Sequence, residues 1–374
     1  MNEQSAIGSP RDRELMQRCL TLARKALGKT SPNPLVGAVI LKDGEIVGEG
    51  FHPRAGEPHA EVFALREAGD KAHGATAYVS LEPCNHFGRT PPCSEALVKA
   101  GVSKVVVGMV DPDPRVSGGG IARLRDAGIE VISGVEEADC QVLNEAFVHR
   151  VRYRQPFGTL KYAMTLDGKI ATSNGHSAWV TGNVAREQVH RLRAATDVVI
   201  VGGNTVRLDN PHLTTHDTSD RDPLRLIMTR TMDLPAERHV WDIVEAPTVI
   251  ATEPGSNPEL REQLLKRNVE IVDFSPLTPG AVSDWLYKRQ CNSALWECGG
   301  KLAAAAIADG CIQKVIAFIA PKIIGGQNAP TPVGEMGLTQ MDAALSLERM
   351  HCLAIAGDIQ CIGYLPQDTW RKGS

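Results

Sequence analysis

This chain of 374 residues has few aromatic residues, no long apolar run and no large excess of either charge. Only 5% of the residues are aromatic, which disfavours the base-stacking surfaces of proteins that bind single-stranded nucleic acid. The 40 basic and 44 acidic residues leave a net charge of −4, which argues against electrostatic wrapping of DNA or RNA. No run approaches the roughly 18 consecutive apolar residues of a membrane span. We therefore expect neither a nucleic-acid nor a membrane partner.

The composition is otherwise that of a globular protein, and the length fits two domains, or three. Residues 1–13 are polar and contain no apolar signal core, so we expect a cytoplasmic protein. The nine cysteines are an odd number and are thinly spread. In a reducing compartment they are expected to be thiols, and a close pair with polar neighbours would indicate a metal site rather than a disulfide.

Alternating helix and strand patterns predict an α/β fold in the first part of the chain. Ser9 and Pro10 have the character of a helix start, and Gly28 is a suitable stop. Asp43-Gly44 between two apolar runs predicts a β-hairpin. The expected elements after the first helix are strands at 36–41, 45–50, 76–81, 104–110 and 129–133 and helices at 59–68, 93–100, 121–127 and 136–149.

The polar segment 151–157, which contains Pro156, is the expected boundary between domains 1–150 and 151–374. Beyond it the alternation resumes, which predicts a mostly parallel sheet that ends in an antiparallel hairpin around Gly357-Asp358. The expected strands are 158–163, 197–202, 224–228, 248–251, 269–272, 294–297, 315–319, 350–355 and 359–364, and the expected helices are 184–195, 259–267, 281–289 and 301–309.

The strongest chemical signal is His59-Ala60-Glu61, followed by Pro83-Cys84 and then by Cys93. One histidine and two cysteines are three good zinc ligands, and three ligands leave the fourth position open for water, as in catalytic zinc sites. Zinc lowers the pKa of bound water to about 7. Glu61, at a helix start, can carry protons between that water and a leaving amine. The alternative is two unrelated buried cysteines and a surface histidine, but the residue order and the Pro-Cys step fit the zinc nucleobase deaminases.

The eight residues between Cys84 and Cys93 depart from the short Cys-x-x-Cys gap of those deaminases. The runs at 31–37, 55–61 and 82–93 resemble the deaminase domain of riboflavin biosynthesis, and the match continues at 111–114. Nearly the whole chain is similar to the family of bifunctional diaminohydroxyphosphoribosylaminopyrimidine deaminases / 5-amino-6-(5-phosphoribosylamino)uracil reductases. The resemblance implies a cytidine-deaminase-like α/β/α domain followed by a dihydrofolate-reductase-like α/β domain.

Two glycine pairs, Gly202-Gly203 and Gly299-Gly300, each follow an expected strand in the second domain. Each alone fits a tight turn as well as a phosphate cradle. Together they indicate a nucleotide in the crevice of an open sheet. By resemblance, the NADPH contacts would be Ala163, Trp179, Thr205, Asp209, Arg230, Gly299, Gly300, Lys301, Leu302, Ala303, Ala304 and Ala305, and the substrate contacts of this domain would be Lys161, Ser177, Arg193, Leu213, His216 and Glu297.

Several of these residues have simpler interpretations without the resemblance. Trp179 fits core packing, Arg193 a solvated helix charge and Asp209 the cap of a turn. Position 216 often carries arginine in the family, so His216 would be a weaker, pH-dependent phosphate partner. In the first domain, Asn33 between two prolines is expected to contact substrate. For His52 and His86 a substrate contact and a surface role both stay open.

The resemblance implies one zinc ion per chain, NADPH as cofactor, a phosphoribosyl pyrimidine as substrate and assembly into a dimer or tetramer. Two other classes of function are weighed against it. A nucleic-acid base deaminase would need a basic strip and the short cysteine gap. A binding or regulatory module derived from a deaminase would have lost a ligand or Glu61, and none is lost here.

Overall fold

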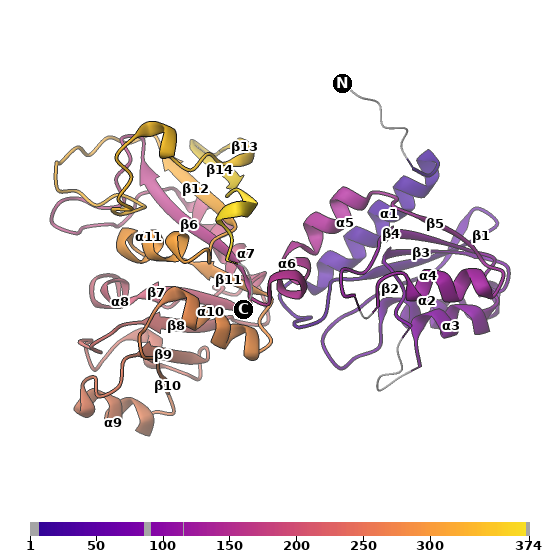
Figure 1. Cartoon of the computed structure of the whole chain (residues 1–374), viewed down its shortest axis with the longest axis horizontal. Helices are drawn as coiled ribbons and strands as arrows, with labels where there is room; N and C mark the ends of the chain where they lie inside the picture. Colours follow the sequence, from indigo (N-terminus) through magenta and orange to yellow (C-terminus); the bar gives the residue numbers. More distant parts are fainter. Residues whose placement is uncertain (1–6, 86–90, 115, 372–374) are drawn as a thin grey trace. The chain divides into compact units, whose positions relative to one another are not determined.

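The computed structural model describes residues 7–85, 91–114 and 116–371 of the chain (Figure 1). The chain divides into two compact units, Met1–Arg152 and Tyr153–Ser374, and each contains its own β-sheet. Within the described residues, no helix is both long enough and apolar enough to cross a lipid bilayer.

The N-terminal unit is a five-stranded sheet with helices on both faces, and its strand order is β2-β1-β3-β4-β5. β1 pairs antiparallel with β2 and β3, whereas β3, β4 and β5 are parallel. Its elements are α1 (Pro10–Ala23), β1 (Gly37–Lys42), β2 (Glu45–Phe51), α2 (Ala60–Ala68), β3 (Thr76–Leu81), α3 (Cys93–Ala100), β4 (Lys104–Met109), α4 (Gly119–Asp126), β5 (Glu130–Ser133), α5 (Glu137–Leu143) and α6 (Glu145–Tyr153).

The two faces of this sheet bury separate apolar clusters because successive strand residues point to opposite sides. Val39 and Val106 pack with α1 and α5, which lie above the sheet in Figure 1. Ile40 and Val107 pack with α2, α3 and α4 on the opposite face. The result is the three-layered α/β/α arrangement that the family resemblance implies.

The C-terminal unit has a nine-stranded sheet in the order β10-β9-β8-β7-β11-β6-β12-β14-β13. The strands from β10 to β12 are parallel, and β14 and β13 complete the sheet as an antiparallel hairpin. Its elements are β6 (Phe157–Thr165), α7 (Asn183–Ala194), β7 (Val198–Gly202), α8 (Gly203–Asp209), β8 (Leu224–Met228), β9 (Thr248–Thr252), α9 (Pro258–Lys266), β10 (Glu270–Asp273), α10 (Pro279–Lys288), β11 (Ser293–Trp296), α11 (Gly300–Ala308), β12 (Lys314–Ala320), β13 (Glu348–Ile355) and β14 (Asp358–Tyr364).

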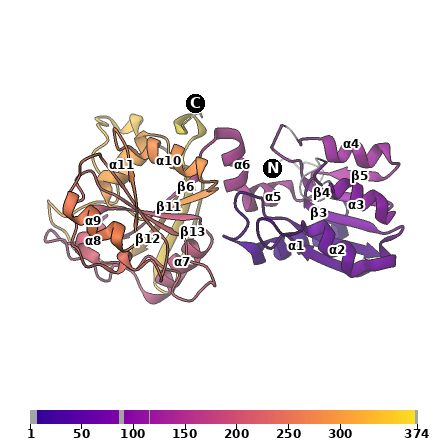
Figure 2. The same ribbon diagram turned by 90° about the horizontal axis from the view of Figure 1, so that it is seen from below.

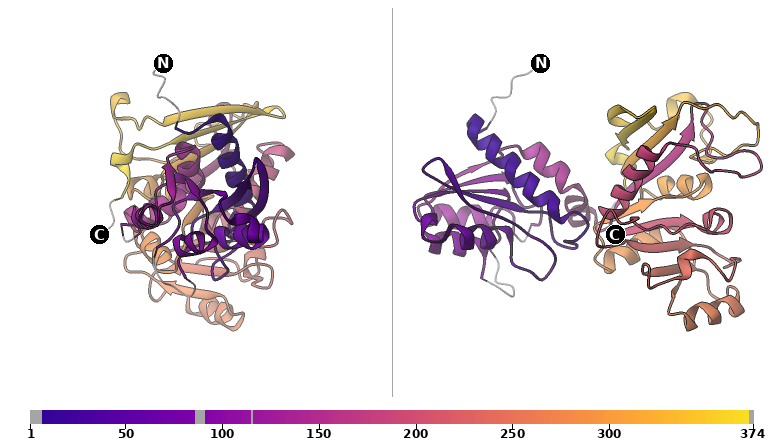
Figure 3. Two further views of the ribbon diagram at one scale, coloured as in Figure 1. Left: turned by 90° about the vertical axis from the view of Figure 1, so that its right-hand side faces the viewer. Right: turned by 180° about the vertical axis from the view of Figure 1, so that it is seen from behind.

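Helices cover both faces of this sheet as well. Ile200 and Leu226 pack with α10 and α11, whereas the neighbouring residues Val199 and Ile227 pack with α8 and α9. Figures 2 and 3 show further views, and in Figure 2 α10 and α11 lie on the side of the unit opposite α7. Because the strands from β10 to β12 run parallel, their carboxyl ends lie together at one edge of the sheet, where the loops that follow them can form a site.

The elements agree with the sequence prediction except in three places. The expected helix 136–149 is two helices, because the Asn144 side chain at the break bonds the N–H and the carbonyl of Leu35, at 2.8 and 3.0 Å. The second of these helices, α6, continues to Tyr153 into the segment expected to link the domains. The short helix α8 was not expected at all.

The expectation that all nine cysteines are thiols is wrong for one pair. Cys352 and Cys361 form a disulfide, whereas the other seven cysteines are thiols that form no disulfide. The two residues lie directly opposite each other on β13 and β14, with their Cα atoms 4.2 Å apart. Antiparallel register brings them together, and a separation of nine residues in sequence did not reveal it.

Candidate active sites

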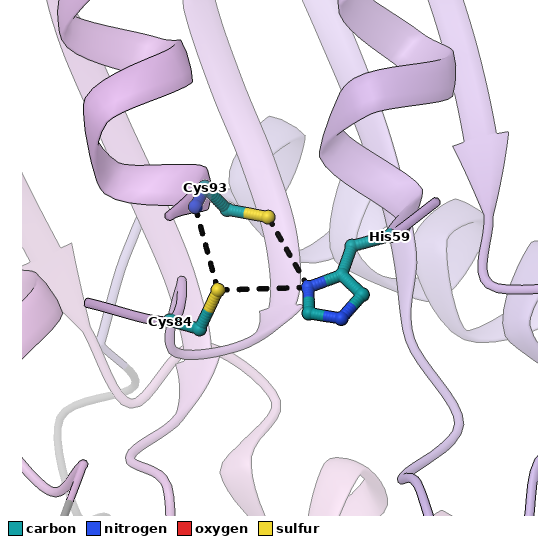
Figure 4. Close-up of side chains that lie close together, drawn as sticks. All are labelled: His59, Cys84 and Cys93. Atoms are coloured by element: carbon teal, nitrogen blue, oxygen red, sulfur yellow. Dashed lines mark hydrogen bonds between the residues drawn. The ribbon is translucent and has the colours of Figure 1, made fainter. Parts of the chain in front are cut away.

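Three side chains of the N-terminal unit form a metal-type cluster at the ends of three elements (Figure 4). His59 precedes α2, Cys84 follows β3, and Cys93 begins α3. The His59 Nδ1 atom lies 3.5 Å from the Cys84 sulfur and 3.3 Å from the Cys93 sulfur. Zinc–nitrogen and zinc–sulfur bonds at a tetrahedral angle would separate such atoms by roughly 3.6 Å. The donor atoms and their spacing therefore fit a zinc ion.

The chemistry of the Cys84 thiol also suits a metal. Hydrogen bonding with Cys93 and His59 lowers the pKa of Cys84 to about 4. The backbone N–H of Cys93 donates to the Cys84 sulfur at 3.4 Å, and it lies at the start of α3, where the helix dipole favours a thiolate.

Glu61 lies in the first turn of α2, and its side chain is buried beside the cluster. Burial raises the pKa of Glu61. Its Oε2 atom has no hydrogen-bond partner among the residues that the structure describes. A buried carboxyl group with a raised pKa and an unused oxygen can accept and return a proton, as predicted for this residue.

Asn33 and His52 meet next to the cluster. The Asn33 Nδ2 and His52 Nε2 atoms are 3.0 Å apart, and the other His52 nitrogen lies 3.0 Å from the Pro58 carbonyl oxygen. The His52 ring is 2% exposed and contacts the His59 ring edge to face. The surface role that stayed open for His52 is therefore wrong, whereas His86 lies outside the described residues.

Glu82 is a further buried residue of this region that the sequence analysis missed. Its carboxylate accepts four backbone N–H groups at 3.0–3.2 Å, from Asp111, Gly118, Gly120 and Ile121. Glu82, two residues before Cys84 in the chain, thereby fixes the start of α4. The only signal was its place in the run Glu82-Pro83-Cys84.

The C-terminal unit contains a cavity of ≈ 1050 Å³ at the carboxyl ends of its parallel strands. Gly299 caps α11, and a Cβ atom at Gly300 would lie 2.6 Å from the Thr331 carbonyl oxygen, so only glycine fits there. The cavity is lined by most of the residues predicted for this domain: Lys161, Ala163, Ser177, Arg193, Thr205, Asp209, Leu213, Arg230, Glu297, Gly299, Gly300, Lys301, Leu302 and Ala305.

Four predicted residues are not among those that line the cavity. Ala303 and Ala304 are buried residues of α11, and Ala303 packs in the apolar core of the unit. Trp179 is 70% exposed, with the Arg186 guanidinium over its ring, so the alternative of core packing is wrong. His216 is exposed and stacks on His190, with ring centroids 4.3 Å apart.

A buried charge cluster forms one wall of the cavity. The Glu297 carboxylate accepts two hydrogen bonds from Arg193, at 2.6 and 3.2 Å, and one from Lys161 at 3.3 Å. Burial alone would raise the pKa of Glu297, yet the two cations outweigh it and hold the pKa at about 2. Arg193 also donates to the Thr214 carbonyl oxygen at 2.9 Å. Its guanidinium is thus an organising group of the site rather than a solvated charge.

Comparison with known proteins agrees with this division. The model of the family "Cytidine and deoxycytidylate deaminase zinc-binding region" matches residues 9–109, and that of the "RibD C-terminal domain" matches residues 156–361. The riboflavin biosynthesis protein RibD of Synechocystis sp. is 59% identical over 95% of this chain and 96% of its own length.

Two solved structures are similar over the full length. Acinetobacter baumannii RibD is 39% identical, with a TM-score of 0.85 over 96% of this chain and 99% of that one. A diaminohydroxyphosphoribosylaminopyrimidine deaminase / 5-amino-6-(5-phosphoribosylamino)uracil reductase of Thermotoga maritima is 36% identical, with a TM-score of 0.85 over 95% and 99% of the two chains.

A zinc-type deaminase domain and a reductase domain in one chain define a bifunctional enzyme. The reductase domain implies a nucleotide cofactor and the deaminase domain a zinc site. The chain belongs to the RibD family, the bifunctional deaminase–reductases of riboflavin biosynthesis. Two predictions are confirmed: a deaminase-like domain is followed by a reductase domain, and the chain is a bifunctional deaminase–reductase.

Proposed function

We propose that the two units catalyse consecutive steps on one phosphoribosyl pyrimidine. The N-terminal unit would deaminate 2,5-diamino-6-hydroxy-4-(5-phosphoribosylamino)pyrimidine. The C-terminal unit would then reduce the ribosyl group of 5-amino-6-(5-phosphoribosylamino)uracil to ribityl. The observation that carries the proposal is the cluster of His59, Cys84 and Cys93 beside a buried Glu61, in one chain with a cavity suited to a nucleotide. The similar protein of Thermotoga maritima is described by both activities.

In the deaminase unit, His59, Cys84 and Cys93 would hold one zinc ion per chain. Bound there, zinc would lower the pKa of a coordinated water and so make a nucleophile available at neutral pH for the ring carbon that bears the amine. Glu61 takes a proton from the attacking water and returns it to the nitrogen that leaves as ammonia, since its pKa is raised by burial. Asn33, held by His52, orients the pyrimidine in this site.

In the reductase unit, NADPH would supply the hydride that reduces C1′ of the sugar once the sugar amine has opened to an imine. A step of this kind needs orientation more than a strong protein nucleophile. Arg193 and Lys161 lie at the cavity wall, where they can hold the substrate phosphate, and the Glu297 carboxylate beside them can accept hydrogen bonds from the sugar. The remaining substrate contacts proposed here are Ser177, Leu213 and His216.

The charge of the cavity supports NADPH over NADH as the cofactor. Arg207, Arg230 and Lys301 line it. Arg230 is exposed and its side chain has no hydrogen-bond or ion-pair partner within the described residues, so its guanidinium is available for a phosphate. The other cofactor contacts proposed are Ala163, Thr205, Asp209, Gly299, Gly300, Leu302 and Ala305, which line the cavity, and Trp179, Ala303 and Ala304, which do not.

Oxidation of NADPH by the purified enzyme, supplied with the diaminopyrimidine, tests both steps together. The parent is expected to release ammonia and consume NADPH. In Glu61→Gln the rate of ammonia release is expected to fall by about 10²–10⁴-fold, while the protein keeps one zinc per chain. It should still consume NADPH when 5-amino-6-(5-phosphoribosylamino)uracil is supplied. A parent that releases ammonia but leaves NADPH untouched would refute the second step, and a metal-free folded parent would refute the first.

A further inference from the structure

Leu213, in the wall of the reductase cavity, has an unusual backbone conformation. Its φ angle is +60°, although its side chain is large and 2% exposed. Residues with a Cβ atom avoid this left-handed region, so the surroundings must hold Leu213 there. The residues on either side, His212 and Thr214, are each held by a hydrogen bond to the backbone carbonyl group.

An arginine binds the carbonyl group on each side of Leu213. Arg193 donates to the Thr214 carbonyl oxygen at 2.9 Å, and Arg225 donates to the His212 carbonyl oxygen at 3.0 Å. Arg193 belongs to the charge cluster of the cavity, whereas Arg225 is fully buried and does not line the cavity. Leu213 therefore lies between one arginine of the site and one that lies behind it.

Arg225 is held rigidly because all five of its N–H groups have acceptors. Besides the His212 carbonyl it donates to the Glu245 carboxylate at 3.0 Å and to the Thr248 hydroxyl at 2.9 Å. Its second terminal nitrogen donates to the carbonyl oxygens of Asp242 and Ala246, at 2.6 and 2.7 Å. Such a network leaves the guanidinium a single position.

Glu245 extends this network to the side chain of the residue next to Leu213. Its second oxygen lies 2.7 Å from His212 Nδ1, so one carboxylate bridges the imidazole and the Arg225 guanidinium. The His212 residue is thus fixed at both its backbone and its ring. Neither Glu245 nor Arg225 touches the cavity, and no motif in the sequence points to them.

We propose that Arg225 and Glu245 are positioning residues of the reductase site, which set the place of Leu213 in the substrate wall by fixing His212. The inference rests on the proposed reductase function. A displaced Leu213 would weaken the fit of the substrate, because small misplacements of positioning groups are costly. It would leave the glycine turn at Gly299, and hence cofactor binding, unchanged.

Glu245→Gln is the main test, since the amide keeps the shape but removes the negative charge and one of the two accepting oxygens. We expect the KM for the supplied uracil substrate to rise roughly ten- to hundredfold, with kcat less affected. The Kd for NADPH and the rate of ammonia release should not change. Arg225→Lys, which cannot reproduce five N–H groups, should shift KM in the same direction.

Glu270→Gln is the matched control, because Glu270 pairs at 2.7 Å with Arg289 in the same unit but away from the cavity. A purely structural role of Glu245 would lower the melting temperature without moving KM, and this result would overturn the proposal. A crystal structure of Glu245→Gln gives an answer independent of activity. A φ at Leu213 that leaves the left-handed region supports the proposal, and an unchanged φ refutes it. A parent without reductase activity would refute the proposed function instead.

Discussion

Replacing Glu297 by glutamine tests how the charge cluster of the reductase cavity is stabilised. The exposed fraction of the side chain is 8% for Glu297, 15% for Lys161 and 12% for Arg193. Glutamine has the same shape but no charge, so it would leave two cations side by side without a counter-ion. Loss of one member of a buried ion pair costs about 3–5 kcal/mol.

The pKa of Glu297 gives an independent magnitude. A fall from the usual 4.5 to about 2 on folding corresponds to about 3 kcal/mol of stability. Because folding lowers this pKa, the contribution is complete above pH 4.5 and is lost as the pH falls towards 2. Glu297→Gln should therefore be destabilised equally at pH 7 and pH 5, and the difference from the parent should shrink at more acidic pH.

Scanning calorimetry of the whole chain would measure this effect. The transition of the C-terminal unit should fall by about 6–20 °C, given 2–4 °C per kcal/mol for a unit of this size. Glu270→Gln, which breaks a surface pair with Arg289, should cost less than about 1 kcal/mol. Ammonia release reports on the N-terminal unit and should be unaffected. A melting shift for Glu297→Gln no larger than that for Glu270→Gln would refute the reasoning.

Three other predictions concern the metal, the cofactor and the disulfide. Removal of zinc by a chelator should abolish ammonia release but leave NADPH oxidation with the supplied uracil substrate intact; loss of both would contradict separate sites. Arg230→Ala should raise the KM for NADPH roughly tenfold or more, as loss of a charged hydrogen bond would, while the KM for NADH is unchanged; an equal rise for both cofactors would contradict a phosphate contact. Alkylation of denatured, unreduced, metal-free protein should modify seven of the nine cysteines and spare Cys352 and Cys361, and modification of all nine would exclude the disulfide.

The sequence by itself determined most of the order of helices and strands and the three residues of the metal-type cluster. Apolar residues at strand and helix periods mark the elements because burial of one face is a local pattern. His59, Cys84 and Cys93 could be named because they are good zinc ligands, and their order and the Pro-Cys step fit the pattern of zinc deaminases.

Only the tertiary structure decided how those elements come into register and which charges meet. The disulfide of Cys352 with Cys361 depends on the pairing of β13 with β14, and the split of the last N-terminal helix depends on a contact of Asn144 with Leu35. The support of Leu213 by the buried Arg225 joins residues from a loop and a strand. Such contacts depend on which strands lie side by side, which periodicity does not encode.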